Sequence, residues 1–184
     1  MNEPLAHSRI LAAKRHAVVE VFGKTALDEV AKVLPAEVRT ETIDAHMTET
    51  WIPERWITEW HRAVWQGPAG EDTAKFYRFV DAMVAQGFGR VRRVLVKLAT
   101  PSLMCERAAE LWRDEHSHGI LAAVVGKNTA QLRLTEHPYC GSKLAAMVIA
   151  ESMRYAGSLS ARAGDVTAGY SLAPGALVID LRWS

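Results

Sequence analysis

Cysteine and long apolar runs are both scarce in this sequence of 184 residues. Its two cysteines, Cys105 and Cys140, form no CxxC motif, so we expect no disulfide framework. Such sparse cysteine usage is typical of a protein that stays in a reducing cytoplasm. The longest uninterrupted apolar run, residues 144–150, is much shorter than the roughly 20 residues of a membrane-spanning helix. The sequence therefore predicts a cytoplasmic protein without a membrane span.

Excess charge of either sign is also missing. The 22 lysines and arginines nearly balance the 21 aspartates and glutamates, which leaves a formal net charge of +1. A chain so close to neutrality is not expected to attract nucleic acid or an anionic membrane strongly. Residues 89–99 do carry four basic side chains on a helical pattern. We interpret them as a solvated helix face or as an interface with an acidic partner, and we predict no nucleic-acid partner.

Several catalytic and targeting signatures are absent as well. The sequence contains no GxGxxG motif after a predicted strand, no P-loop and no GxSxG nucleophile elbow. These absences argue against the common dinucleotide, nucleoside-triphosphate and α/β-hydrolase sites. Arg9, Lys14 and Arg15 interrupt any apolar stretch near the N-terminus, so we expect no signal peptide.

The spacing of apolar residues divides the chain into two halves. Helical periodicity extends to about residue 118, and short alternating runs then bracket one further helix. In "TAQLRLTE", for example, Ala130, Leu132 and Leu134 alternate with polar residues, as in a half-exposed strand. We predict an α+β fold in which an N-terminal helical lobe packs against a C-terminal antiparallel sheet with β-β-α-β-β order. The predicted organisation is a single domain, 1–184, with a helical lobe over 1–118 and an α/β lobe over 119–184.

The helical half contains a stretch, "TETWIPERWITEWHRAVW", with four of the six tryptophans. Two interpretations compete: an aromatic ligand cage, or a core helix rich in tryptophan. Trp56, Ile57, Trp60, Ala63 and Val64 fall on one helical face, which favours the core helix. Pro53 suits the first helical position, and this predicts that Trp51 packs on Trp56 as a hydrophobic staple.

Two short motifs bring together residue types that could carry chemistry. "EHSHG" places His116 and His118 at a predicted helix end, where with Glu115 they could meet a metal ion. A solvated helix terminus is the simpler interpretation, because histidine interacts well with the helix dipole there. "HPYC" places His137 before Cys140, which fits either a Cys–His catalytic pair or a cysteine packed under the sheet. We assign no catalytic residue and no metal site on these fragments.

The segments "FGKTALDEVAKVLPAEVR", "WIPERWITEW" and "GFGRVRRVLVKLATPSLMCERAAELWRDEHSHG" resemble a paralogous family of uncharacterised bacterial proteins. The ending, "YCGSKLAAMVIAESMRYAG" followed by a hairpin that closes on "LRW", resembles the same group. That family is similar to four-vinyl-reductase small-molecule-binding domains and, more remotely, to haem–nitric-oxide-binding domains. The resemblance implies a helical lobe on a twisted antiparallel sheet, an apolar pocket and a homodimer.

The sequence departs from both of those groups at their ligand motifs. Vinyl-reductase-type domains carry extra cysteines in the last hairpin, where this chain has Gly169 and Leu177. The haem-binding relatives carry a Tyr-x-Ser-x-Arg motif, and this sequence contains none. We therefore predict neither the metal site of the first group nor the haem of the second, and we assign no cofactor.

The predicted helix at 144–156 is apolar on more sides than a single sheet could cover. We therefore predict a non-catalytic small-molecule-binding or sensory module, with a small hydrophobic ligand in an apolar pocket between the helical lobe and the sheet. The residues that we expect to line it are Trp112, His116, Cys140 and Tyr155. The alternatives are a homodimeric protein-interaction scaffold and an enzyme that uses Cys140 or the His116/His118 pair.

Overall fold

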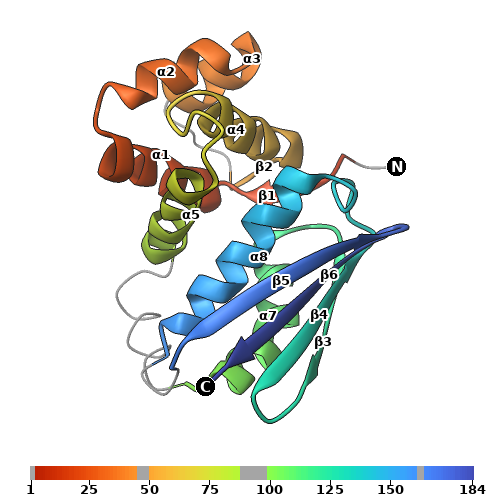
Figure 1. The fold of residues 1–184 in the computed structure, drawn as a ribbon. Coiled ribbons are helices and arrows are strands. Elements are labelled where there is room, and N and C mark those ends of the chain that lie inside the picture. The colour runs from red at the N-terminus through yellow and green to blue at the C-terminus, as the bar shows by residue number, and fades with distance from the viewer. Residues whose placement is uncertain (1–2, 45–49, 88–98, 161–163) are drawn as a thin grey trace. The chain divides into compact units, whose positions relative to one another are not determined.

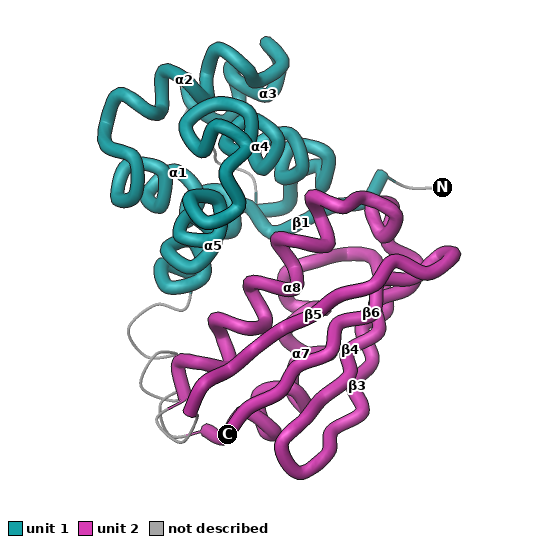
Figure 2. The backbone as a smooth tube through the Cα atoms, viewed as in Figure 1, with its two compact units in different colours: residues 1–87 teal, residues 88–184 magenta. Residues whose placement is uncertain are grey.

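The computed structural model describes residues 3–44, 50–87, 99–160 and 164–184. The chain forms two compact units, residues 1–87 and residues 88–184, which Figure 2 distinguishes by colour. The predicted helix over 89–99, with its basic residues, lies outside the described residues apart from its last position. These units are defined by contacts within each of them, which does not test whether the chain is one domain. The predicted single domain, 1–184, therefore stays a prediction.

Unit 1 is helical apart from one short strand pair. Strands β1 and β2 are antiparallel, with Ala6 opposite Ile52. The elements, of which all but η1 are labelled in Figure 1, are β1 (Leu5–His7), α1 (Arg9–Phe22), α2 (Ala26–Val33), α3 (Ala36–Arg39), the π-helix η1 (Thr40–Asp44), β2 (Trp51–Pro53), α4 (Glu54–Gln66) and α5 (Thr73–Gly87). Gly23 ends α1 with a positive φ of 89°, as its position in the sequence indicated. Asp72 caps α5 by accepting a hydrogen bond from the backbone N–H of Lys75 at 2.9 Å.

The tryptophan-rich stretch is a core helix. Trp60 is fully buried in α4, and its indole N–H donates to Thr42 Oγ1 at 2.8 Å. Trp56 lies on the same buried face, and Trp65 packs edge-on against Phe76 with ring centroids 5.3 Å apart. The predicted staple is wrong in detail: Trp51 belongs to β2, is 38% exposed and packs against His7. Strand pairing therefore takes the place of the staple, and Glu54 begins the helix.

Unit 2 is a four-stranded antiparallel sheet with its helices on one face. Within the sheet the strands lie in the spatial order β3-β4-β6-β5. Along the chain, β3 and β4 are followed by helix α8 and then by β5 and β6, which is the predicted β-β-α-β-β order. The elements are α7 (Pro101–Glu115), β3 (Ile120–Val125), β4 (Thr129–Thr135), α8 (Lys143–Ser158), β5 (Val166–Ala173) and β6 (Ala176–Trp183). Helix α7 packs mainly on β3, whereas α8 packs mainly on β5 (Figure 1). This unit confirms the predicted α+β fold class.

The core of unit 2 follows from the alternation along its strands. Leu132 and Leu134 of β4, and Ile179 of β6, are fully buried and face the two helices. Cys105, Ala108 and Trp112 bring α7 into this same core. Helix α7 therefore belongs with the sheet, although its sequence pattern groups it with the preceding helices.

Helix α8 is at least half-buried on all of its sides, as its apolar composition indicated. From Leu144 to Ser158 each residue is buried or half-buried. No helix in the described parts of the chain is long and apolar enough to cross a bilayer.

Removing a side chain from the centre of the sheet tests this description of the core. Ile179→Ala should lower the free energy of unfolding by about 2–5 kcal/mol, because it leaves a cavity under both helices. The control is Val124→Ala on edge strand β3, whose side chain is 74% exposed and whose loss should cost within about 0.5 kcal/mol. Urea unfolding measures both, and equal costs would contradict the assigned faces of the sheet.

A second test concerns the buried histidine of unit 1. Burial, and then the charge of Lys14, hold the pKa of His61 well below its ordinary value of 6.5. The unfolded chain therefore binds a proton at His61 that the folded chain does not, and stability should fall as the pH drops below about 6.5. The slope from this one residue can reach about 1.4 kcal/mol per pH unit.

The variant His61→Leu should remove that part of the pH dependence. It should also preserve stability at pH 7.5, because Nε2 of His61 is buried and makes no hydrogen bond to any residue that the structure describes. Urea unfolding at several pH values between 5 and 7.5 measures the difference. His16→Leu, at an exposed position of α1, is the control. An unchanged slope in His61→Leu would show that another group causes the acid sensitivity.

Candidate functional site

The candidate site of unit 2 begins where α7 ends. Thr100 caps this helix by accepting a hydrogen bond from the N–H of Leu103 at 3.2 Å, and Pro101 lies in the first turn, where its missing N–H costs no hydrogen bond. Fifteen residues later the chain leaves the helix at His116, whose backbone is extended at φ −132° and ψ 135°. The N–H of His116 still donates to the carbonyl of Trp112 at 2.9 Å. The imidazole of His116 is thereby held one turn from Trp112.

Trp112 fixes the segment that follows the helix. Its indole is buried in the core of unit 2, and its Nε1–H donates to the carbonyl oxygen of His118 at 2.9 Å. The same indole stacks on the imidazole of His116, with ring centroids 4.1 Å apart and planes inclined by 14°. One side chain thus positions both histidines of the "EHSHG" motif.

A third histidine joins them through the β3–β4 hairpin. These strands pair antiparallel from Val125 opposite Ala130 to Ile120 opposite Thr135. Two further steps along this register place His118 across from His137. The structure agrees, since the two rings are inclined by 31° and their centroids lie 4.8 Å apart.

The three imidazoles form a compact group, which we call the histidine cluster: His116, His118 and His137. The ring centroid of His116 lies 5.8 Å from that of His118 and 6.3 Å from that of His137. One ring nitrogen from each of the three lies within 4.8 Å of the others. His137 is buried and the other two are half-buried. Neutral imidazole nitrogens so close together are suited to binding a single metal ion or a small polar ligand.

Gly119 makes the close packing around the cluster feasible. It has a positive φ of 77°, and a Cβ atom there would lie 3.1 Å from Trp112 Nε1 and 3.4 Å from the Cβ of His137. A side chain at this position would therefore press on two members of the site. Gly119 is therefore the residue whose missing side chain leaves room for the close packing of Trp112 and His137.

The other residues singled out from the sequence lie in different surroundings. Cys140 is buried, and its Sγ–H donates to the carbonyl of Leu134 at 3.4 Å, in the same core as Trp112. Tyr155 is half-buried on α8, about 18 Å along the helix from Lys143 at a rise of 1.5 Å per residue. Glu115 is not among the converging donors of unit 2. The structure thus brings Trp112, His116 and His118 together and adds His137.

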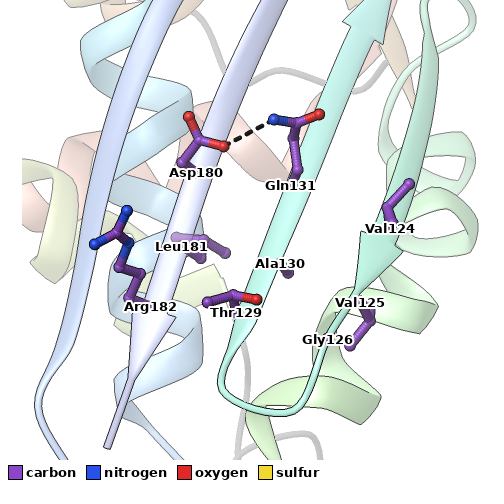
Figure 3. A pocket seen from close by; sticks show the side chains of 9 residues that line it. All are labelled: Val124, Val125, Gly126, Thr129, Ala130, Gln131, Asp180, Leu181 and Arg182. Carbon is purple, nitrogen blue, oxygen red and sulfur yellow. Dashed lines mark hydrogen bonds between the residues drawn. The ribbon is translucent and has the colours of Figure 1, made fainter.

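A separate open hollow lies along the sheet at the β3–β4 turn (Figure 3). Gln131 Nε2 donates to Asp180 Oδ1 across it at 2.9 Å. The residues that line it are Val124, Val125, Gly126, Thr129, Ala130, Gln131, Asp180, Leu181 and Arg182. Because charged and amide side chains line it in part, this hollow differs from the apolar pocket that the sequence predicted.

Comparison with known proteins gives a fold but no close relative. No protein-family model matches the sequence, and a search of curated proteins finds no similar one. Three solved structures that are similar to this chain are H-NOX proteins, each aligned over 97% of this chain. The Fe(II) unliganded H-NOX protein from K. algicida has a TM-score of 0.66 at 9% identity, with 96% of its chain covered. The H-NOX protein from S. oneidensis in the Fe(II)NO state has 0.65 at 12% identity, with 99% covered.

An oxygen-binding H-NOX domain related to soluble guanylate cyclases, in its oxygen complex, is also similar, with a TM-score of 0.61 at 12% identity and 95% of its chain covered. The chain therefore has an H-NOX-like fold, as its remote resemblance to haem–nitric-oxide-binding domains implied. At this level of identity the likeness concerns the fold alone.

The convergence of three imidazoles in unit 2 is not an arrangement that a haem requires. A haem iron already holds four porphyrin nitrogens and accepts axial ligands only on its two opposite faces. The three imidazoles of unit 2 instead converge on one point, and Trp112 stacks at 4.1 Å on His116. Burial and the neighbouring Glu106 raise the pKa of the Cys105 thiol to about 11, which disfavours a thiolate ligand.

Substituting Gly119 tests the packing of the site. Gly119→Ala should lower the free energy of unfolding by about 2–4 kcal/mol, from a strained backbone and from crowding against Trp112. Gly175→Ala is the matched control, because Gly175 has a similar φ of 67° and no atom lies within 4 Å of the place that an added Cβ would occupy. That variant should lose only about 1 kcal/mol. Urea unfolding compares them, and equal losses would show that crowding plays no part.

Proposed function

We propose that this chain is a non-catalytic sensory module that binds a small molecule beside Trp112 and the histidine cluster. The observation that carries the proposal is the convergence of one buried indole and three imidazoles where α7 meets the β3–β4 hairpin. Sites for small ligands commonly combine an aromatic wall with a few polar groups that fix the orientation of the ligand. The H-NOX likeness supports a small-molecule-binding sensor domain, since two of those proteins were solved with oxygen or nitric oxide bound.

The surroundings of the two cysteines argue against a cysteine nucleophile. The thiol of Cys140 is buried and bonded to the carbonyl of Leu134, which is typical of a packed core cysteine. The high pKa of Cys105 disfavours a thiolate nucleophile there. These observations favour the sensory module over an enzyme that uses a cysteine.

Several finer properties stay predictions from the sequence. They are the apolar character of the ligand and its pocket, the participation of Cys140 and Tyr155 in the site, the homodimer and the cytoplasmic location. The relation to four-vinyl-reductase domains belongs with them. The haem-free state is our own proposal and follows from the converging geometry of the imidazoles.

Native mass spectrometry of the untagged protein tests the ligand site. The folded protein should retain a small molecule when it is isolated from cells, or should take one up from a fragment library. Trp112→Ala should reduce the bound fraction by about tenfold or more, because it removes the aromatic wall and releases His118. Trp51→Ala, at an exposed tryptophan of unit 1, is the control and should bind as the unaltered chain does.

Two outcomes would contradict parts of this proposal. Equal loss of binding in Trp51→Ala would place the ligand away from the histidine cluster, and an absence of any ligand in both assays would remove the sensory role. Addition of haemin should yield no stoichiometric complex. A one-to-one haem complex with histidine ligation would overturn the haem-free assignment and leave the sensory role in place.

A further inference from the structure

We infer that His116, His118 and His137 form a binding site for one divalent transition-metal ion, of which Zn²⁺ is the best-fitting example. This inference stands on the geometry of the three side chains and does not depend on the proposed function. Imidazole nitrogen is a preferred ligand of Zn²⁺ and of its first-row neighbours. Three histidines are also the set that some zinc sites use while leaving one coordination position open.

The distances within the cluster suit an ion of this size. Zinc binds imidazole nitrogen at about 2.0–2.1 Å, so the donors of a tetrahedral site lie about 3.3 Å from one another. The three nitrogens of the cluster already lie within 4.8 Å of one another. Inward movements of about an ångström or less complete the site, and ring rotations at the end of a helix and in two loop segments supply them.

Three separate elements position the ligands. His116 follows α7 directly, His118 precedes β3, and His137 follows β4. The helix end and the two facing strands at the open end of the hairpin thus each contribute one imidazole, and a tetrahedral or five-coordinate site can accept all three. Unit 2 therefore supplies three ligands. The remaining position is available to water or to a small molecule.

Neighbouring groups hold two of the rings in place. Trp112 stacks on His116 and fixes the backbone carbonyl of His118. The N–H of Tyr139 donates to Nδ1 of His137 at 3.2 Å. If the ion binds Nδ1 it replaces this long hydrogen bond, and if it binds Nε2 the proton moves to Nδ1 and the bond is lost. Either exchange replaces the contact with Tyr139 by a metal–nitrogen bond.

The pairing of strands β3 and β4 does not itself require histidine at these three positions. The positions lie just outside the paired residues of β3 and β4, which extend from Ile120 to Val125 and from Thr129 to Thr135. Convergence of three of the chain's seven histidines is therefore better explained by a shared ligand than by packing.

Metal titration of the untagged, chelator-treated chain tests the inference. One equivalent of Zn²⁺ should bind in competition with a chromophoric chelator, and Co²⁺ should give the intense visible absorption of a tetrahedral or five-coordinate complex. Each of His116→Ala, His118→Ala and His137→Ala should weaken binding by at least about 100-fold, since loss of a mere supporting group costs up to that factor. His16→Ala, which removes an exposed histidine of α1, should bind within about twofold of the unaltered chain.

Folding of the variants is checked separately by circular dichroism. Zn²⁺ should also raise the unfolding temperature of the unaltered chain and of His16→Ala, because the ion binds the folded state. If an alanine variant fails to fold, the corresponding asparagine variant takes its place and should show the same loss of affinity.

Three results would overturn the metal site. They are unchanged affinity in the cluster variants, equal weakening in His16→Ala, and octahedral Co²⁺ spectra typical of surface binding. The two proposals fail separately, because mass spectrometry distinguishes a bound zinc ion from a bound organic molecule. An ion without a further ligand supports the metal site alone, and an organic ligand without an ion supports the sensory role alone.

Discussion

The register of one antiparallel hairpin determines where the histidine cluster of unit 2 lies. Strands β3 and β4 pair so that Leu121 and Leu134 are opposite each other, and the same register carried outward sets His118 against His137. A slip by one residue would turn the buried side of β4, including Leu132, toward solvent. The core that fixes the strands therefore also fixes the backbone positions of two of the three histidines.

Trp112 then connects the helix to the hairpin. Its indole is part of the core that α7 shares with the sheet, its N–H is bonded to the carbonyl of His118, and its face covers His116. Burial of an indole contributes several kcal/mol to folding, and the one polar atom of this indole is satisfied by the segment that carries the site. The stability of the core and the geometry of the histidine cluster are thus linked through the side chain of Trp112. The close approach of Gly119 to that indole is part of the same arrangement.

The sequence is informative wherever its periodicity is simple. Alternation over residues 129–135, helix caps such as Asp72 and the final hairpin all follow local rules of spacing, and the fold class is predictable from them. Sequence reasoning pairs His137 with Cys140 because the two are neighbours along the chain. The partnership of His137 with His118 depends on hairpin register, which one sequence reveals only after both strands and the turn are placed.

The likeness to H-NOX proteins and the histidine cluster carry different kinds of information. A backbone that superposes over 97% of the chain at 9–12% identity shows that many different side chains can satisfy this architecture. What the chain binds is therefore decided by the few residues that the architecture does not require. A buried or half-buried imidazole gives up hydration that an apolar side chain would not, so packing alone would favour apolar replacements at such positions. Three imidazoles, gathered beyond the ends of two strands and covered by an indole, are more easily explained as ligands than as structural residues.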